Sequence, residues 1–372
     1  MYVDFETLDH VPRISPSGKV APAAPRSHAP AGHLALLSYG LKTEYLRTVT
    51  AILSFYANLS GRREDFPTVL FTDAPEFFRD YLRELPIEYE QIRKEELEAW
   101  RERYGCHHAI KIVMIERALQ RFDAPVMFVD SDTFFTADGS PLFRHVRDDR
   151  AIMHTAEYSF TSDYVERLEQ DHPIKLFRDR MTGRTFYLSS GNTVEVAPDS
   201  LSWNAGAIVL HPSHARLLPD VYELTRRFYE GSGCHTAEQY AFSIVLGASG
   251  TIKACDEFLV HYWEGVSKPI ADVILKRRVE NIWNRLPLNE RLCSTRSLAV
   301  TLRQAFEEHV LALKHDTLRY FREGDSRTAL NRAFRALLKD PFDLEFIKSI
   351  YAYRSHVADA FLRKTKRMIF AS

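Results

Sequence analysis

Along the first third of the chain, the pattern of apolar and polar residues predicts strands and helices in alternation. Short apolar runs bounded by turn residues predict strands, and longer segments with apolar residues at helical spacing predict helices. In chain order these segments are HLALLSYG, TEYLRTVTAILSFYANL, FPTVLFTDA, EFFRDYLREL, the weaker strand IEYEQI, and HHAIKIVMIERALQRF. This alternation predicts an α/β domain with a mostly parallel sheet flanked by helices.

The next strand, APVMFVDSDTFF at residues 124–135, ends on Asp130 and Asp132. Open parallel sheets bind ligands at the carboxyl ends of their strands. Residues two apart in an extended segment face the same side, so both carboxylates can address one point while Ser131 turns away. Two such carboxylates repel each other unless a cation joins them, and Mg²⁺ or Mn²⁺ prefers oxygen ligands. The strand end therefore predicts a divalent metal site.

Two other interpretations fit the same string. Asp-x-Asp in a loop is often a solvated turn or a helix cap. An apolar strand before Asp-x-Asp-x-Thr also matches haloacid dehalogenase-type phosphatases, in which Asp130 would be the nucleophile and Asp132 an acid/base. Such a phosphatase needs a later acidic pair on a strand end, and the sequence offers no convincing one.

Composition narrows the class of protein. The 372 residues are 45% hydrophobic, which is enough for a sizeable core, and the 49 basic side chains balance 50 acidic ones, so nucleic acid is not an expected partner. No apolar run approaches the roughly twenty residues that cross a bilayer, and no secretory signal is recognisable. The four cysteines lie far apart along the chain, at Cys106, Cys234, Cys255 and Cys293. This spacing argues against a zinc knuckle and against a disulfide scaffold. We expect a cytoplasmic protein.

Three segments are expected along the chain. Residues 1–32 are rich in proline and predict a flexible tail, residues 33–270 form the α/β domain, and residues 271–372 predict a helical appendage. The last stretch, RSHVADAFLRKTKRMIF, alternates basic and apolar residues as a helix lying at the inner face of an anionic membrane does. A solvated terminal helix fits this pattern equally well.

Two further stretches carry candidate chemistry. LSWNAGAIVLHPS places Asn204, Ala205 and Gly206 before a strand, where small residues let backbone approach a ligand and an amide can bind hydroxyls. HTAEQYAFSIVLG opens an apolar helix with Glu238 and Gln239. The alternatives are an ordinary strand-entry turn and an acidic first helical turn.

The stretch LVHYWEGVSKP combines three useful groups. His261 offers a metal-binding imidazole, Gly265 offers a flexible backbone, and Lys268 offers a cation. A lone histidine is more often structural than a ligand. The combination favours a metal and diphosphate site.

The ordered motifs FVDSD, NAGAIVL, EQ and HYWEGVSKP, spread over about residues 33–270, resemble those of glycosyltransferases with the GT-A fold. The resemblance is greatest to retaining family 8, which includes glycogenins and bacterial lipopolysaccharide galactosyl- and glucosyltransferases. It implies a Rossmann-like GT-A catalytic domain and hexosyltransferase activity. It also implies Mn²⁺ bound by Asp130, Asp132 and His261, a UDP-sugar donor, and a glycan, lipid or protein acceptor.

The resemblance implies further roles. Lys268 would bind the diphosphate, Lys111 would contact the donor, and Asn204 would touch the donor sugar. The residues that it places around the donor are Lys111, Asn204, Ala205, Gly206, Gly265 and Lys268. Glu238 and Gln239 would act at the face of the sugar, as catalytic residues.

The chain departs from the family pattern in three places. One extra residue separates His261 from Gly265, and Glu238-Gln239 replaces the usual Asp-Gln. The resemblance therefore supports the transfer of a sugar more strongly than it supports retention of the anomeric configuration. Residues 155–190 form a long insertion that could bind the acceptor. A catalytically inactive GT-A-like protein that binds nucleotide or glycan is the alternative that these departures leave open.

Overall fold

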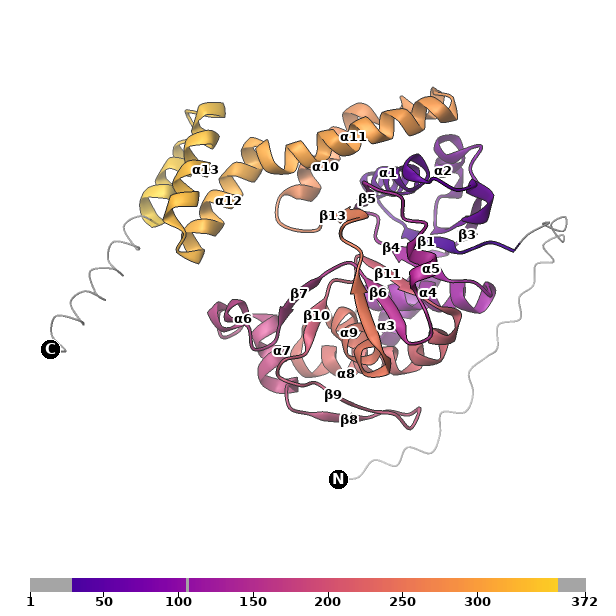
Figure 1. Ribbon diagram of the computed structural model, residues 1–372. Helices are drawn as coiled ribbons and strands as arrows, with labels where there is room; N and C mark the ends of the chain where they lie inside the picture. The colour runs from indigo at the N-terminus through magenta and orange to yellow at the C-terminus, as the bar shows by residue number, and fades with distance from the viewer. Residues whose placement is uncertain (1–28, 105–106, 354–372) are drawn as a thin grey trace.

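A seven-stranded sheet forms the centre of the molecule in the computed structural model, which describes residues 29–104 and 107–353 (Figure 1). In spatial order its strands are β12 (Thr251–Ala254), β6 (Arg150–Met153), β11 (Ala207–Leu210), β4 (Val126–Val129), β1 (His33–Ser38), β2 (Thr68–Thr72) and β3 (Ile87–Gln91). The predicted α/β class, with a mostly parallel sheet flanked by helices, is confirmed.

The strand order creates a switch point beside β1. The strands β1, β2 and β3 are parallel and follow one another toward one edge of the sheet. Strand β4 pairs with β1 on its other side and is also parallel to it. Beyond β4, strand β11 is antiparallel to both β4 and β6, and β12 pairs in parallel with β6. A crevice forms where the direction of winding reverses, at the carboxyl ends of β1 and β4.

Helices cover both faces of the sheet because successive strand residues point to opposite sides. Val126 and Phe128 of β4 pack into one core with α3, α4, α8 and α9, while Met127 and Val129 pack into the other with α1, α2, α10 and α11. The bounds of the helices in the α/β domain are α1 Lys42–Asn58, α2 Pro75–Leu82, α3 Lys94–Tyr104, α4 Ile110–Arg121, α5 Leu142–His145, α6 Asp163–Arg167, α7 Pro173–Met181, α8 Leu218–Ser232 and α9 Ala237–Ser249.

Short ladders and 3₁₀ turns complete the fold. The ladders pair β13 (Leu259–His261) with β5 (Thr133–Phe135), β10 (Leu201–Trp203) with β7 (Ala156–Ser159), and β8 (Thr185–Tyr187) with β9 (Thr193–Glu195). The 3₁₀ turns are η1 Arg63–Asp65, η2 His107–Ala109, η3 Pro212–Leu217 and η4 Trp283–Arg285. The pairing of β13 with β5 matters most, because it brings His261 opposite Thr133, next to the Asp-x-Asp turn.

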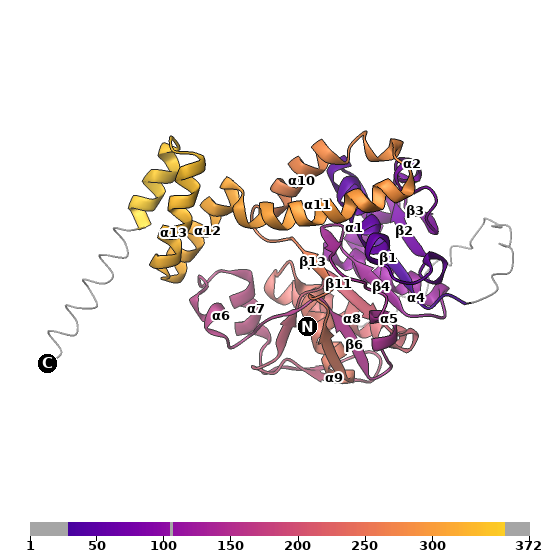
Figure 2. The same cartoon turned by 45° about the horizontal axis from the view of Figure 1, so that its top comes forward.

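The C-terminal region is helical, as predicted. Its helices are α10 Ser267–Arg278, α11 Leu288–Glu308, α12 Val310–Glu323 and α13 Ser326–Lys339. The long helix α11 runs along the face that holds α1, and α12 and α13 form a hairpin beside the α/β body (Figures 1 and 2). The hairpin has a small core of its own, built from Leu313, Ala333, Ala336 and Phe346.

One local prediction was wrong, and one helix was missed. The spacing of apolar residues predicts one helix over residues 297–321, but the structure has two, because His309 adopts an extended backbone and its ring accepts a hydrogen bond from the Leu311 amide, which starts α12. The polar helix α3 was not predicted. Residues 1–28 of the tail predicted at 1–32 lie outside the described residues, and so do Cys106 and the basic segment 354–370. Among the described residues, Cys234, Cys255 and Cys293 are free. None of the helices in the described part of the chain combines the length and the apolarity that a bilayer crossing requires.

Candidate functional site

A cavity of about 1010 Å³ opens at the carboxyl ends of β1 and β4, where the topology predicts a ligand site. Of the residues singled out in the sequence, all but Gly265 line this cavity. Those that do are Lys111, Asp130, Asp132, Asn204, Ala205, Gly206, Glu238, Gln239, His261 and Lys268. The motifs that lie far apart along the chain therefore meet in one place.

Three candidate metal ligands converge on one wall. One ligand atom from each of Asp130, Asp132 and His261 lies within 4.8 Å of the others. His261 Nε2 is 3.5 Å from Asp132 Oδ1 and 3.9 Å from Asp130 Oδ2. Backbone pairing fixes the geometry, since the Asp130 amide donates to the Gly206 carbonyl and the Tyr262 amide donates to the Asp132 carbonyl.

The histidine has a defined proton position. His261 Nδ1 lies 2.8 Å from Asn204 Oδ1, and the amide nitrogen of Asn204 donates to Glu157 Oε1 at 2.8 Å. Asn204 Oδ1 is thus an acceptor, so Nδ1 carries a proton and Nε2 is the ring nitrogen that faces the two aspartates. A Cβ at Gly206 would lie 2.0 Å from His261 Nδ1, so only glycine leaves room for the ring. Two carboxylates and an oriented imidazole are suitable ligands for Mn²⁺ or Mg²⁺. The described residues therefore fit either cation.

Two lysines neutralise the aspartates. Lys111 is buried, and its Nζ lies 2.9 Å from Asp130 Oδ2 and 2.9 Å from the Ala205 carbonyl. Lys268 Nζ lies 2.7 Å from Asp132 Oδ2 and its side chain is 40% exposed to solvent. Burial opposes the charge of Asp132, but His261 and Lys268 outweigh it and hold the pKa of this carboxyl well below its usual range. Asp132 is therefore ionised and ready to bind a cation.

The first turn of α9 supplies the opposite wall. Glu238 is buried, and its Oε2 has no hydrogen-bond partner among the described residues. Burial disfavours the charged form of Lys111, but the negative charges of Asp130 and then Glu238 outweigh it and raise the pKa of this lysine. The cavity thus contains a buried carboxylate with free hydrogen-bonding capacity.

Gln239 is held by the protein itself. Its Oε1 accepts from the Ala205 amide at 3.1 Å, and its Nε2 donates to Glu157 Oε2 at 2.8 Å and to Ser202 Oγ at 2.9 Å. Gln239 therefore fixes the Asn204-Ala205-Gly206 turn.

Two acidic residues in the cavity wall were missed by sequence reasoning. Glu157 of β7 accepts hydrogen bonds from both Asn204 and Gln239. Glu44 in the first turn of α1 accepts a hydrogen bond from Ser131, and burial raises the pKa of its carboxyl. The one available signal was the position of Glu44, just after the strand that borders the crevice.

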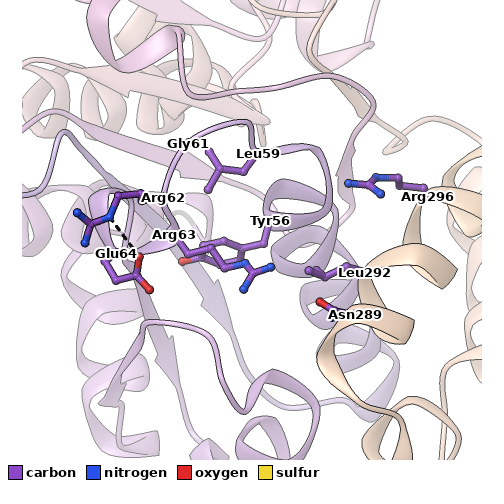
Figure 3. A pocket seen from close by; sticks show the side chains of 9 residues that line it. All are labelled: Tyr56, Leu59, Gly61, Arg62, Arg63, Glu64, Asn289, Leu292 and Arg296. Atoms are coloured by element: carbon purple, nitrogen blue, oxygen red, sulfur yellow. Dashed lines mark ion pairs between the residues drawn. The ribbon is translucent and has the colours of Figure 1, made fainter.

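A second cavity, of about 520 Å³, lies between η1 and α11 (Figure 3). Arg63 and Arg296 lie on its two sides, and Arg62 forms a loose ion pair of 3.9 Å with the exposed Glu64. Arg296 Nε donates to the Ala57 carbonyl at 2.7 Å and so ties α11 to the end of α1. No group of metal ligands lies here, because within residues 29–104 and 107–353 the only such group is Asp130, Asp132 and His261. The larger cavity is therefore the candidate functional site.

Neither a protein-family model nor a curated protein sequence matches the chain. Several solved structures are similar to it. The galactosyltransferase LgtC in complex with donor and acceptor sugar analogs is 11% identical with a TM-score of 0.43, over 72% of this chain and 95% of LgtC. The apo form of mouse xyloside xylosyltransferase 1 is 11% identical with a TM-score of 0.38, over 60% of this chain and 84% of that one.

The bifunctional glycosyltransferase WbbM, also in its apo form, is 12% identical with a TM-score of 0.40. The match covers 63% of this chain, and this chain spans only 40% of the WbbM chain.

Proposed function

We propose that this protein is a metal-dependent glycosyltransferase of the GT-A type, similar to retaining family 8. It would transfer a hexose from a UDP-sugar to the hydroxyl of a glycan, lipid or protein acceptor, with retention. The observation that carries the proposal is the meeting of Asp130, Asp132 and His261 with Lys268 and Glu238 in one cavity at the switch point of the sheet. The order of the motifs along the chain supports the same function.

The site suits the departure of a diphosphate. Breaking the bond between sugar and diphosphate leaves negative charge on the leaving group, and a divalent cation held by Asp130, Asp132 and His261 would supply positive charge there. Lys268 lies beside Asp132 and is partly exposed, so its ammonium can bind the same diphosphate. Lys111 is already bound to Asp130 and Ala205, so its role is to neutralise Asp130.

The sugar develops positive charge as the bond breaks. Glu238 presents a buried carboxylate oxygen without a partner among the described residues, and we assign it the stabilisation of that charge on one face of the sugar. Gln239 acts through the turn that it holds, as a positioning residue. Asn204 likewise acts through His261.

The test is release of nucleoside diphosphate from a panel of nucleotide sugars with Mn²⁺ and candidate acceptors. We expect release by the wild type and a loss of roughly 10²-fold or more in Asp132→Asn, because the cation site loses a charged ligand. Asp171→Asn is the matched control, since this exposed aspartate does not line the cavity.

The other outcomes point to other functions. Release that survives in Asp132→Asn contradicts the metal site. Nucleotide binding without release from any donor favours the binding protein, and hydrolysis of simple phosphate esters with Mg²⁺ alone favours the phosphatase.

A further inference from the structure

One loop connects the metal wall of the cavity to the lysine. Residues 262–266, named here the motif loop, run from His261 at the end of β13 to the start of α10, where Lys268 lies in the first turn. The loop brings Trp263 and Glu264 to the cavity wall. Its position therefore decides where Lys268 and Trp263 stand relative to a bound donor.

The loop has little packing of its own at its centre. Gly265 has a φ of +55°, a backbone conformation that favours glycine, and it contributes no side chain. Trp263 is 49% exposed and the Lys268 side chain is 40% exposed. A loop with so few buried side chains depends on contacts from outside to keep one conformation.

The helical appendage supplies such a contact. The imidazole of His315, on α12, lies against Gly265, so that a Cβ on this glycine would be only 2.7 Å from His315 Cε1 and 3.0 Å from Nε2. The ring of His315 occupies the space in which any other residue at position 265 would place its side chain.

A second contact comes from the end of α11. The ring of Phe306 lies 5.3 Å from that of Tyr262 and 6.4 Å from that of Phe134, measured between centroids. Tyr262 follows His261, and its amide donates to the Asp132 carbonyl. The junction of α11 and α12 thus touches the motif loop at two positions, with Phe306 on Tyr262 and His315 on Gly265.

Charge adds to this packing. Burial lowers the pKa of Arg319, one turn beyond His315 on α12, but acidic neighbours outweigh it and raise the pKa overall. Glu264 of the motif loop is one of these neighbours, after Asp316 and Glu323 of the same helix. Arg319 is thus attracted to Glu264 of the loop as well as to Asp316 and Glu323, with which it forms ion pairs at 3.3 Å and 3.6 Å.

We propose that His315 is a positioning residue of the active site and that the α11–α12 junction holds the motif loop in place. The appendage then belongs to the catalytic machinery, because Lys268 reaches the diphosphate only when α12 is seated on Gly265. This inference rests on the proposed function for its kinetic consequence. The packing itself can be tested without any activity.

The first experiment is hydrogen exchange on the full chain with His315→Ala. We expect the amides of residues 262–268 to exchange at least about tenfold faster than in the wild type, with β4 unchanged, because the loop loses its outside contact. Arg322→Ala is the matched control, an exposed side chain on the same helix. Equal exchange of the loop in His315→Ala and Arg322→Ala overturns the inference.

The second experiment is donor kinetics and Mn²⁺ binding with the same variants. We expect His315→Ala to raise the donor KM roughly tenfold, since a small misplacement of Lys268 weakens diphosphate binding. Mn²⁺ affinity should stay within about twofold, because Asn204 and Gly206 fix His261 independently. An unchanged donor KM in His315→Ala overturns the inference. If the wild type itself shows no turnover, the proposed function is wrong, and the hydrogen-exchange experiment alone tests the packing of His315 on Gly265.

A double-mutant cycle with Gly265→Ala separates packing from general damage. In the wild type the added methyl meets the imidazole, whereas in His315→Ala that space is open. We expect Gly265→Ala to raise the donor KM at least about threefold more in the wild type than in the His315→Ala background, as neighbouring sites couple. Equal costs in both backgrounds contradict the contact.

Discussion

A histidine serves as a metal ligand when its second nitrogen is held by a hydrogen bond that sets the tautomer and the ring angle. In this chain that partner is the amide oxygen of Asn204, 2.8 Å from His261 Nδ1. The same oxygen also accepts from the Gly206 amide at 2.9 Å, while the Asn204 nitrogen donates to Glu157. One asparagine thus fixes the imidazole, the turn beneath it and a buried carboxylate.

We predict that Asn204→Ala weakens Mn²⁺ binding by roughly 10- to 100-fold, because His261 loses its orienting partner while all three ligands remain. Titration of Mn²⁺ followed by electron paramagnetic resonance measures the change. Asn192→Ala serves as the control, since the Asn192 amide bonds to Asp220 and does not line the cavity. Wild-type affinity in Asn204→Ala would show that the asparagine does not position the ligand.

The residues of the site differ in how far the sequence could reveal them. Asp130, Asp132 and His261 lie in motifs whose local pattern signals chemistry, and the structure brings them together. Glu157 and Glu44 carry no such pattern. Their contacts, with Asn204 and Ser131, span 47 and 87 positions along the chain, and only the folded sheet creates them.

Secondary structure was predictable where burial produces a continuous apolar run or a regular spacing of apolar residues in the sequence. Strands β1, β2 and β4 are apolar runs buried in the sheet, and α4 buries a regular apolar face. Helix α3, with the sequence KEELEAWRERY, buries Leu97 and packs the partly buried Trp100 against the same core, but polar residues surround these two, so it has no clear apolar stripe. The antiparallel direction of β11 was not predicted, because a short buried run reads the same in either direction.

The turn η3 contains a buried histidine that should make stability depend on pH. His214 accepts the His211 amide on Nδ1 at 3.3 Å, so its Nε2 donates to the Asp148 carbonyl at 3.0 Å, which describes a neutral ring. Burial lowers the pKa of His214 below the value of about 6.5 for an exposed histidine. The unfolded chain therefore takes up this proton more readily than the folded one.

We predict that this contribution to the free energy of unfolding is complete above pH 6.5 and is lost as the pH falls below it, by no more than about 1.4 kcal/mol per pH unit. Urea unfolding of the wild type and His214→Gln between pH 7.5 and 5 measures it. The variant should show a shallower pH dependence. His145→Gln, at an exposed position, should keep the wild-type slope, and an unchanged slope in His214→Gln contradicts the prediction.

At the scale of the whole molecule, stability is distributed unevenly. Two large cores lie on the faces of the central sheet, whereas the hairpin of α12 and α13 relies on a third and much smaller core. Its outer face leaves Phe334 64% exposed and Leu338 69% exposed. Because a small core offsets less of the conformational entropy of folding, the hairpin should open more readily than the sheet does.

We predict that Leu313→Ala destabilises the hairpin by about 3 kcal/mol and leaves the α/β body unaffected, because this fully buried leucine fills the smallest core. Hydrogen exchange should show faster exchange along α13 and no change in β4. Leu311→Ala is the control, since Leu311 lies on the same helix and is 44% exposed. If the amides of β4 and α13 respond in step, the molecule opens as one cooperative unit and the hairpin has no separate stability. If exchange becomes faster in α13 but not in β4, α12 can lose its contact with the motif loop while the cavity itself stays folded.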